Sequence, residues 1–520
     1  MLYKKLQTLA STAAAASLLS ATTAQAGNCS SRGIAPPVIP EGRVLGLSAS
    51  PVRNYQTEDN STLNFCNVTV TYTHPGKDDN IHVTVWLPLS GWSGRLQGSG
   101  GGGYAMRHDD SYLAEAVALK YSVVATDGGH EAVSSVSESW SLGADSNVNM
   151  ALLEDFASIG LNDAALIGKQ VTRSFYGHGP QFSYWNGCST GGRQGLMLAQ
   201  RYPTAYDGIM AAAPAINWPS FLVAEYWPQF IMNQLQTYPA KCVTDAITNA
   251  TIKACDGLDG VTDGIISAPD LCRFNPLKLV NSTANCDGMP VKITRRDALV
   301  VQKTWEGLKS ANGSSLWYGL NKGTPLSMGA SSLAGTTCDT PLSNCSGSPF
   351  SISADWISRF VLQDPSIDLT QLDHHDLDTI FASSKARYNA IIGTDNPDLS
   401  AFKFTGGKMI TWHGLADPLI FPKGTEHYYR QAEALDPALR DFYRFFPAPG
   451  VNHCRGGDGP IPVDPLSAVV EWVEQGVAPE SIAAKASDGR RRNLCPWPLV
   501  SVYKGGDAMD AENYACEESF

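Results

Sequence analysis

The chain has 520 residues, of which 43% are hydrophobic and only 17% charged. This composition describes a globular protein with a large core and excludes a mainly disordered chain. The formal net charge of −12 argues against a partner with a phosphate backbone, so we expect no nucleic-acid binding. The length suggests two or three domains, or one α/β core that carries a large insertion.

Residues 1–26 have the pattern of a secretory signal peptide. Lys4 and Lys5 form a basic start, a stretch rich in Ala, Leu and Ser follows, and Ala24-Gln25-Ala26 has the small-x-small form of a cleavage site. No later segment is long and apolar enough to span a bilayer, so we expect a soluble, secreted, extracellular protein with no membrane partner. The oligomeric state stays open.

Cysteines and glycosylation sequons also fit a secretory route. The chain has twelve cysteines, an even number that suits an oxidising compartment. Seven N-x-S/T sequons are compatible with a glycoprotein, although such triplets also occur by chance. They lie at Asn28, Asn60, Asn67, Asn249, Asn281, Asn312 and Asn344.

The first part of the mature chain alternates between short β-rich runs and helical stretches. Apolar spacing predicts strands at 67–72, 82–87, 95–97, 121–126, 182–185 and 208–212, with helices at 111–119, 152–172 and 193–201. Such repetition predicts a mostly parallel sheet with helices on both faces.

Residues 216–402 interrupt this pattern. They hold six cysteines and many Asn, Gly, Ser and Thr turns, and we interpret them as an inserted domain. The alternation then resumes, with strands at 408–412 and 442–446 and helices at 424–435 and 465–475. The expected organisation is a signal peptide (1–26), a first core part (27–215), the insertion (216–402) and a second core part (403–520).

The strongest chemical motif is Gly187-Cys188-Ser189-Thr190-Gly191, between a predicted strand and a predicted helix. This is the setting of a nucleophile elbow, in which small residues allow a sharp turn that exposes the serine Oγ. The helix N-terminus behind it favours a developing oxyanion. The alternative is a turn serine that only caps the next helix.

A nucleophilic serine needs a base and an acid that orients the base, and in α/β-hydrolases these follow in the order acid, then histidine. Asp417 lies just after the predicted strand 408–412, and His453 just after 442–446. We expect His453 to move the Ser189 proton and Asp417 to hold the imidazole tautomer. His413 is the rival base, although chain order favours His453.

The oxyanion hole should combine the backbone amide of Thr190 with one from the glycine-rich run 98–104, where Gly102 and Gly103 are the candidates. The same run matches the G-x-G-x-x-G dinucleotide fingerprint. A poorly marked helix onset and the absence of an NAD supply outside the cell argue against that alternative. A flexible glycine loop is the other one.

Cysteines flank two of the proposed catalytic residues. Cys188 precedes Ser189 and Cys454 follows His453. If Ser189 and His453 lie within hydrogen-bond reach, a disulfide between their neighbours is geometrically plausible. Such a bond would hold the elbow against the histidine loop. A thiol nucleophile at Cys188 does not suit an oxidising compartment.

A third motif is the acidic segment from Cys255 to Ile265. It places three carboxylates and three glycines within residues 256–264, which offers hard oxygen ligands for Ca²⁺. The spacing departs from the EF-hand, because no glutamate stands at the twelfth loop position. An acidic turn without metal is the alternative.

Taken together, the elbow 187–191, Asp417 and His453-Cys454 resemble the tannase and feruloyl esterase family, whose hallmark is a Cys-Ser, Asp, His-Cys set. The resemblance extends from about Cys66 to the C-terminus. It implies an α/β-hydrolase core with a large lid domain inserted between the nucleophile and the acid.

The resemblance also implies a structural calcium ion and a disulfide framework. The implied calcium ligands are the side chains of Asp256, Asp259 and Asp263 and the carbonyls of Val261 and Ile265. The implied disulfides are Cys188–Cys454, Cys255–Cys272, Cys29–Cys66, Cys338–Cys345 and Cys495–Cys516, which leaves Cys242 and Cys286 to each other.

The leading hypothesis is a secreted serine esterase that cleaves feruloyl or other hydroxycinnamoyl esters through an acyl-enzyme on Ser189. The expected partner is a small-molecule or plant cell-wall aromatic ester. A tannase acting on gallate esters is the alternative within this chemistry, and a non-catalytic secreted protein that binds polyphenol or polysaccharide is the alternative of another class. Five aromatic residues are candidates for the acyl pocket or for the lid core: Trp218, Phe221, Tyr226, Trp227 and Phe230.

Overall fold

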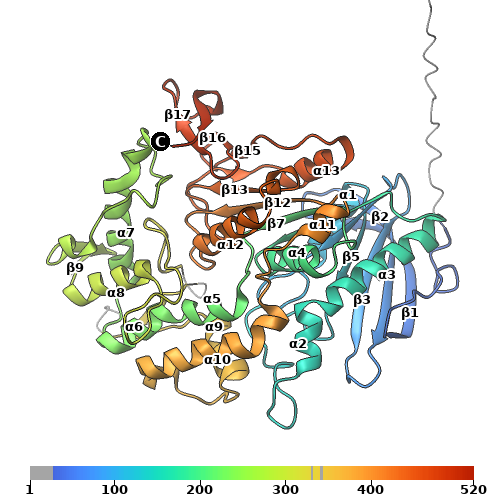
Figure 1. Ribbon diagram of the computed structural model, residues 1–520, viewed down its shortest axis with the longest axis horizontal. Coiled ribbons are helices and arrows are strands. Elements are labelled where there is room, and N and C mark those ends of the chain that lie inside the picture. Colours follow the sequence, from blue (N-terminus) through green and yellow to red (C-terminus); the bar gives the residue numbers. More distant parts are fainter. Residues whose placement is uncertain (1–26, 329–331, 340–343, 520) are drawn as a thin grey trace, which may run out of the picture.

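A computed structural model describes residues 27–519 except 329–331 and 340–343, so the predicted signal peptide lies outside the described residues. The largest element is a nine-stranded sheet with the order β1-β2-β3-β5-β4-β6-β7-β12-β13 (Figure 1). The strands are β1 (Arg43–Gln56), β2 (Thr62–Thr73), β3 (Ile81–Pro88), β4 (Arg95–Ser99), β5 (Ser122–Thr126), β6 (Phe182–Cys188), β7 (Gly208–Ala212), β12 (Lys408–Gly414) and β13 (Tyr443–Ala448).

Most neighbouring strands of this sheet run parallel. From β5 through β4, β6, β7 and β12 to β13 every pairing is parallel, whereas β1, β2, β3 and β5 pair antiparallel. The carboxyl ends of the parallel strands therefore meet at one edge, where an α/β fold places its site. The prediction of an α/β-hydrolase core with a mostly parallel sheet is confirmed.

Helices cover both faces of the sheet. Successive side chains of a strand point to opposite sides, and both sets are apolar here, so both faces must be buried. Tyr184 and Met210 pack in one cluster with Val469 of α13, while Trp185 and Ile209 pack in another with residues of α4. The helices around the sheet are α1 (Asp110–Ala118), α2 (Met150–Ala157), α3 (Ile159–Tyr176), α4 (Thr190–Arg201), α12 (Pro422–Leu435) and α13 (Pro465–Gln475).

Two predictions for the large sheet and its helices differ from the structure, and the short strands within residues 461–517 were not predicted. The helix predicted at 152–172 is two helices, α2 and α3, which are separated at Ser158 by an extended φ of −159°. Strand β1 has no counterpart among the predicted strands. It is an edge strand paired only with β2, none of its residues is buried and Pro51 is exposed, so it lacks the apolar alternation of a buried strand.

The chain between β7 and β12 adds no strand to the large sheet in its described part. It forms helices and two small hairpins, most of which occupy the left and lower left of Figure 1, whereas its last short helix, residues 400–404, lies near α4. These elements are α5 (Trp218–Glu225), α6 (Trp227–Leu235), α7 (Lys241–Cys255), β8 (Thr283–Cys286), β9 (Met289–Lys292), α8 (Arg295–Glu306), β10 (Thr336–Cys338), β11 (Cys345–Gly347), α9 (Ser351–Asp355), α10 (His374–Ile392) and α11 (Ser400–Phe404).

The five aromatic residues considered for the acyl pocket belong to the packed interior. Each of them is at most 3% exposed, and all lie in one hydrophobic cluster that joins residues of the insertion to residues of the core such as Trp185 and Leu196. Their burial supports the lid-core interpretation rather than a pocket lining.

Six disulfides cross-link the chain, and no described cysteine is free. The pairs are the expected ones: Cys29–Cys66, Cys188–Cys454, Cys242–Cys286, Cys255–Cys272, Cys338–Cys345 and Cys495–Cys516. Within the described residues, no helix has the length and apolar character needed to cross a bilayer.

Candidate active site

Ser189 sits at the sharp turn between β6 and α4, at the carboxyl edge of the sheet. Its backbone has φ 63° and ψ −123°, a strained conformation for a residue with a side chain. Glycine is required beside it, because a Cβ at Gly187 would lie 2.5 Å from the Gly191 carbonyl group. Within the described residues, the Ser189 Oγ has no hydrogen-bond partner.

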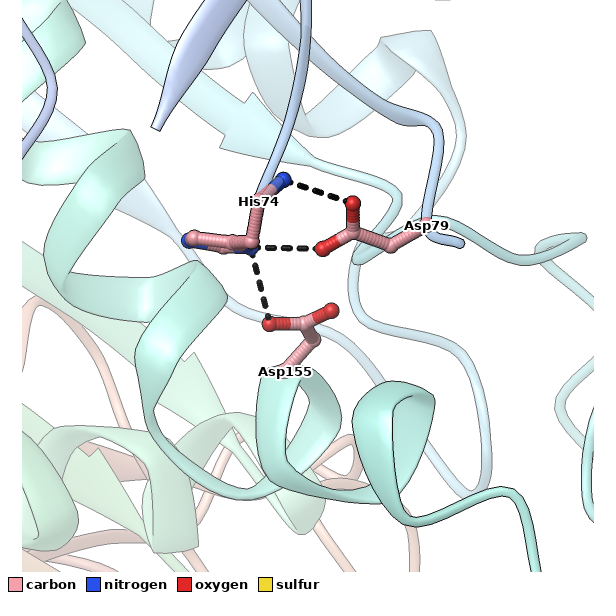
Figure 2. A group of neighbouring side chains, drawn as sticks. All are labelled: His74, Asp79 and Asp155. Atoms are coloured by element: carbon pink, nitrogen blue, oxygen red, sulfur yellow. Dashed lines mark hydrogen bonds and ion pairs between the residues drawn. The ribbon is translucent and has the colours of Figure 1, made fainter. Parts of the chain in front are cut away.

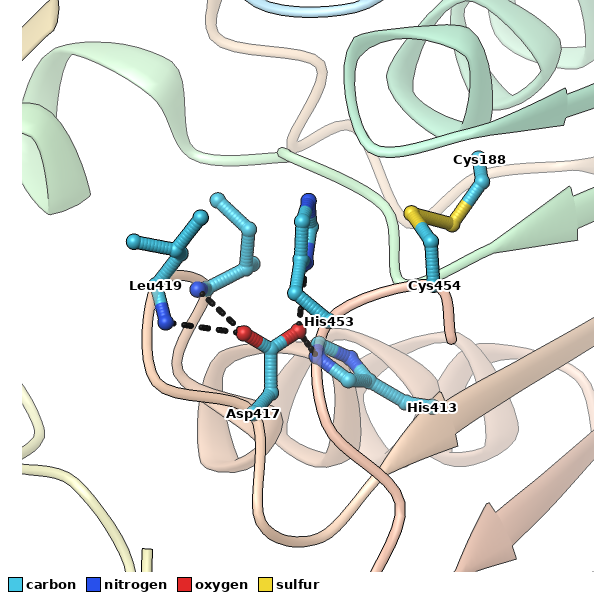
Figure 3. The surroundings of a disulfide bond; sticks show 7 residues. Cys188, His413, Asp417, Leu419, His453 and Cys454 are labelled. Atoms are coloured by element: carbon cyan, nitrogen blue, oxygen red, sulfur yellow. Dashed lines mark hydrogen bonds and ion pairs between the residues drawn. A yellow bond between two sulfur atoms is a disulfide. The ribbon is translucent and has the colours of Figure 1, made fainter. Parts of the chain in front are cut away.

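Asp417 follows β12 and is fully buried, yet its carboxylate is surrounded by donors (Figure 3). Oδ1 accepts the amides of Leu419 and Ile420 at 2.8 and 2.9 Å. Oδ2 accepts from His453 Nδ1 at 2.7 Å and from His413 Nε2 at 3.0 Å. Burial would raise the pKa of Asp417, but the charge of His453 and the two histidine hydrogen bonds outweigh burial and hold that pKa well below its usual range. Asp417 is therefore an ionised carboxylate.

His453 follows β13, and its side chain is 16% exposed. Nδ1 is held by Asp417, whereas Nε2 has no partner among the described side chains and backbone groups. The histidine loop passes so close to the end of β12 that a Cβ at Gly414 would lie 2.3 Å from the Val451 carbonyl oxygen. Close packing of these two loops fixes the position of the imidazole.

His413 differs from His453 in its solvent exposure and in the partners of its ring nitrogens. It is fully buried, and each ring nitrogen already has a partner: Nδ1 contacts Thr425 Oγ1 at 2.8 Å and Nε2 contacts Asp417. Because it has no free nitrogen and no solvent contact, His413 is positioned to orient Asp417 rather than to act as the base.

The Cys188–Cys454 disulfide joins the elbow to the histidine loop. The two Cα atoms are 6.0 Å apart across 266 positions of sequence, and Figure 3 shows the bond beside the His453 ring. No hydrogen bond joins Ser189 to His453 in the described structure. Catalytic hydrogen bonds are often long without substrate and tighten when it binds.

Replacing both Cys188 and Cys454 by alanine should lower kcat by about 100-fold, because a small displacement of the imidazole from Ser189 is costly. The matched control is Cys29→Ala with Cys66→Ala, which removes a disulfide between the N-terminal segment and β2. Both variants should melt earlier, and only the first should lose kcat on an activated ester. An unchanged kcat in the first variant would remove the positioning role of the bond.

The glycine-rich run packs directly against α4. Thr190 Oγ1 donates to the Gly103 carbonyl at 2.7 Å, and the Gly101 amide donates to Gln194 Oε1 at 3.0 Å. The amides of Thr190 and Gly103 have no acceptor among the described residues, so both are available to an oxyanion. The Gly102 amide donates to the Ala105 carbonyl at 3.1 Å, which removes it from the predicted oxyanion hole.

The acidic segment 255–265 closes on itself after α7. Asp256 and Asp259 are buried, and neither pairs with a described Lys, Arg or His side chain. The Asp256 carboxylate accepts the amides of Asp263 and Gly264 at 3.0 Å each. Burial raises the pKa of Asp259, and the nearby carboxylates of Asp263 and Asp256 add to the rise.

The other predicted ligands lie in the same turn. The carbonyl oxygens of Val261 and Ile265 accept no hydrogen bond from the described residues, while their amides donate to Asp259 and Asp263. The Asp263 carboxylate also forms ion pairs with Arg490 at 3.2 Å and Arg492 at 2.8 Å. Two buried carboxylates without a basic partner and two carbonyls without a donor are oxygen ligands of the kind that Ca²⁺ prefers. The carboxylates of Asp256, Asp259 and Asp263 do not all lie within 4.8 Å of one another, so binding would have to draw them together.

Comparisons with known proteins agree with this architecture. The profile of the family described as tannase and feruloyl esterase matches residues 66–517. A probable feruloyl esterase of Arthroderma benhamiae is 40% identical over 506 residues, which cover 94% of this chain and 93% of the relative.

Two solved structures are similar over nearly the whole chain. The tannin acyl hydrolase of Aspergillus niger has a TM-score of 0.85 and 25% identity, with 94% of this chain and 95% of that one covered. Feruloyl esterase B of Aspergillus oryzae has a TM-score of 0.77 and 28% identity, with 92% and 97% covered. The chain therefore belongs to the tannase and feruloyl esterase family of carboxylic ester hydrolases.

Proposed function

We propose that this esterase hydrolyses esters of aromatic carboxylic acids, with feruloyl and other hydroxycinnamoyl esters as the leading class, through an acyl-enzyme on Ser189. The observation that supports this proposal most directly is the orientation of His453. The ionised Asp417 holds its Nδ1, and its Nε2 remains free beside the elbow. The names of the similar proteins support the aromatic acyl group.

In the proposed acylation, the Ser189 Oγ attacks the ester carbonyl carbon while His453 Nε2 takes its proton. The amides of Thr190 and Gly103 donate to the oxyanion. His453 then returns the proton to the leaving alcohol, and Asp417 stabilises the imidazolium that exists between these steps. A water molecule, deprotonated by His453, releases the acid and restores Ser189.

The insertion contacts the glycine-rich loop that we assign to the oxyanion hole, which places it near the proposed acyl site. Tyr104, which follows Gly103, donates through its hydroxyl to the Ile352 carbonyl at 3.0 Å, and Ile352 lies in α9 of the insertion. We propose that the insertion (216–402) acts as the lid over the acyl group, between the two core parts 27–215 and 403–520.

The test is a comparison of kcat/KM on methyl ferulate, methyl caffeate, methyl gallate and p-nitrophenyl acetate, with Ser189→Ala as the blank. We expect the highest value on ferulate or caffeate. A clear preference for gallate would identify the alternative, a tannase. Activity on the acetate alone, or on no ester, would contradict the aromatic-ester proposal.

We further propose that the segment 255–265 holds a structural Ca²⁺ through Asp256, Asp259, Asp263 and the Val261 and Ile265 carbonyls. The ion would neutralise the two unpaired buried carboxylates. Chelation should then lower Tm by about 3 °C, since a site filled at 100 times its Kd contributes about 2.7 kcal/mol and a chain of this length unfolds with an entropy of about 1 kcal/mol/K. Asp259→Asn is the control, whose Tm should not respond to calcium. A wild-type melt that is unchanged by chelation would support an acidic turn without metal.

We propose that the protein is secreted. Six disulfides support an oxidising compartment, as does the N-terminal sequence pattern. Six of the seven sequon asparagines are exposed, whereas Asn67 lies half-buried within β2. Glycosylation should therefore spare Asn67, and peptide mapping of protein from a eukaryotic host checks this.

A further inference from the structure

A second cluster of metal-binding residue types lies on elements that carry none of the proposed catalytic side chains. His74 and Asp79 belong to the turn between β2 and β3, and Asp155 lies near the end of α2 (Figure 2). The side chain of His74 is 7% exposed and those of Asp79 and Asp155 are fully buried. Within the described residues, this is the one group of three His, Cys, Asp or Glu side chains whose ligand atoms all lie within 4.8 Å of one another.

His74 is oriented so that Nδ1 faces the two acids. Its other nitrogen, Nε2, contacts Asp163 Oδ2 at 3.0 Å, and the same oxygen accepts the Tyr72 hydroxyl at 3.1 Å. A carboxylate on the far nitrogen is how proteins fix the tautomer and ring orientation of a metal-binding histidine.

Asp79 is held in a matching way. Its Oδ1 accepts the Thr73 hydroxyl at 2.6 Å and the His74 amide at 2.7 Å. These bonds fix the carboxylate and leave Oδ2 directed at His74 Nδ1, 2.5 Å away.

Asp155 lacks the partners that a buried carboxylate needs. Neither of its oxygens has a hydrogen-bond partner, and Oδ1 is 3.7 Å from His74 Nδ1, too far for a hydrogen bond. The nearby Lys77 pairs instead with Glu154, at 2.5 Å. An ionised carboxylate buried without compensation is strongly unfavourable, and burial raises the pKa of Asp155 to about 7. Either a proton or a cation should therefore lie between Asp155 and its neighbours.

We propose that His74 Nδ1, Asp79 Oδ2 and Asp155 Oδ1 bind a divalent transition-metal cation, for which Zn²⁺ is the test ion. One nitrogen and two oxygens in a small buried site suit Zn²⁺ or Mn²⁺ better than Ca²⁺, which takes six to eight oxygens. Ligands about 2.0–2.2 Å from an ion lie about 3.3 Å apart in a tetrahedral site. The His74–Asp79 contact would therefore open slightly when the cation replaces the proton between them, and that proton would be released.

The position of the site indicates a structural role. The residues after Asp155 present their carbonyls to Arg193 of α4: Phe156 accepts at 2.9 Å and Ala157 at 2.8 Å. A cation bound by Asp155 would therefore join the β2–β3 turn to α2, and through Arg193 to the helix that begins after Ser189. Loss of the cation should chiefly lower Tm.

The experiment is elemental analysis of the mature protein, secreted into zinc-supplemented medium and purified without a metal-affinity tag. The wild type should hold about one zinc per chain in addition to any calcium. Asp155→Asn and His74→Gln should lose at least 90% of the zinc and keep the calcium, while Asp259→Asn should do the reverse. The matched control is His82→Gln, which breaks the half-exposed pair between His82 of β3 and Asp127 just after β5, and which should keep both ions.

A second measurement on the wild type keeps the proposal testable if the variants do not fold. Zn²⁺ added to chelator-treated protein should raise Tm in a saturable way, and calcium alone should not replace it. Zinc-free wild-type protein together with no response of Tm to Zn²⁺ would overturn the proposal, because the cluster would then hold a proton only. Zinc retained equally in Asp155→Asn would also overturn it.

Discussion

Replacing Ser189 by alanine should lower kcat on aromatic and activated esters by about 10⁶-fold, as expected when the nucleophile of a triad is removed. The reason is chemical: without Oγ no acyl-enzyme forms, and the oxyanion donors and His453 retain only a small effect on direct attack by water. The measurement is kcat and KM for the purified variant beside the wild type. A loss of less than tenfold would mean that another group is the nucleophile.

The control for this variant uses the backbone strain at the elbow. Ser189 has φ 63°, and such strained residues cost about 1–3 kcal/mol that glycine largely avoids. Ser189→Gly should therefore be as inactive as Ser189→Ala and more stable than the wild type by about 1 kcal/mol. A melt of both variants separates lost chemistry from lost folding.

Asp417→Asn should lower kcat by about 10⁴-fold with little change in KM, because an amide cannot hold the His453 tautomer or stabilise its imidazolium. The wild-type carboxylate keeps its charge by four hydrogen bonds in a fully buried position. Since the pKa of Asp417 is held low, its ionisation should not limit activity at mildly acidic pH.

His413→Gln is the matched comparison, because it removes a different partner from the same oxygen. Its effect on kcat should be about tenfold or less, with a lower Tm from the loss of a buried contact. If His413→Gln were as damaging as Asp417→Asn while His453→Gln stayed active, the assignment of the base would be wrong.

Much of this fold could be predicted from the sequence, because the strands that carry the site are short, apolar and buried. The run 208–212 is fully buried between helices, and its predicted bounds coincide with β7. The elbow can be recognised in the sequence because the sharp turn leaves no room for a Cβ at Gly187 and little at Gly191, so both positions are glycine. The order of Ser189, Asp417 and His453 along the chain reflects the order of the strands that precede them.

Other features depend on contacts that a sequence pattern does not contain. The Gly102 amide is occupied because the backbone turns back to Ala105, and no spacing rule indicates that bond. Asp417 accepts hydrogen bonds from two histidines, and the one from His413 was not predicted. The spacing of four residues between His413 and Asp417 is the sequence feature that could have indicated it. The cluster of His74, Asp79 and Asp155 combines a turn with a helix more than seventy positions later, so only the fold brings it together.

The most direct test of the central claim is mass spectrometry after reaction with a serine-directed phosphonate. The tryptic peptide 174–193 contains three serines, Ser174, Ser183 and Ser189, so fragmentation of the reduced peptide must locate the adduct. We expect one adduct per chain, on Ser189, and none in Ser189→Ala or after prior incubation with a slowly turned-over aromatic ester. An adduct on another residue, or an active enzyme that the phosphonate leaves unlabelled, would contradict the acyl-enzyme on Ser189.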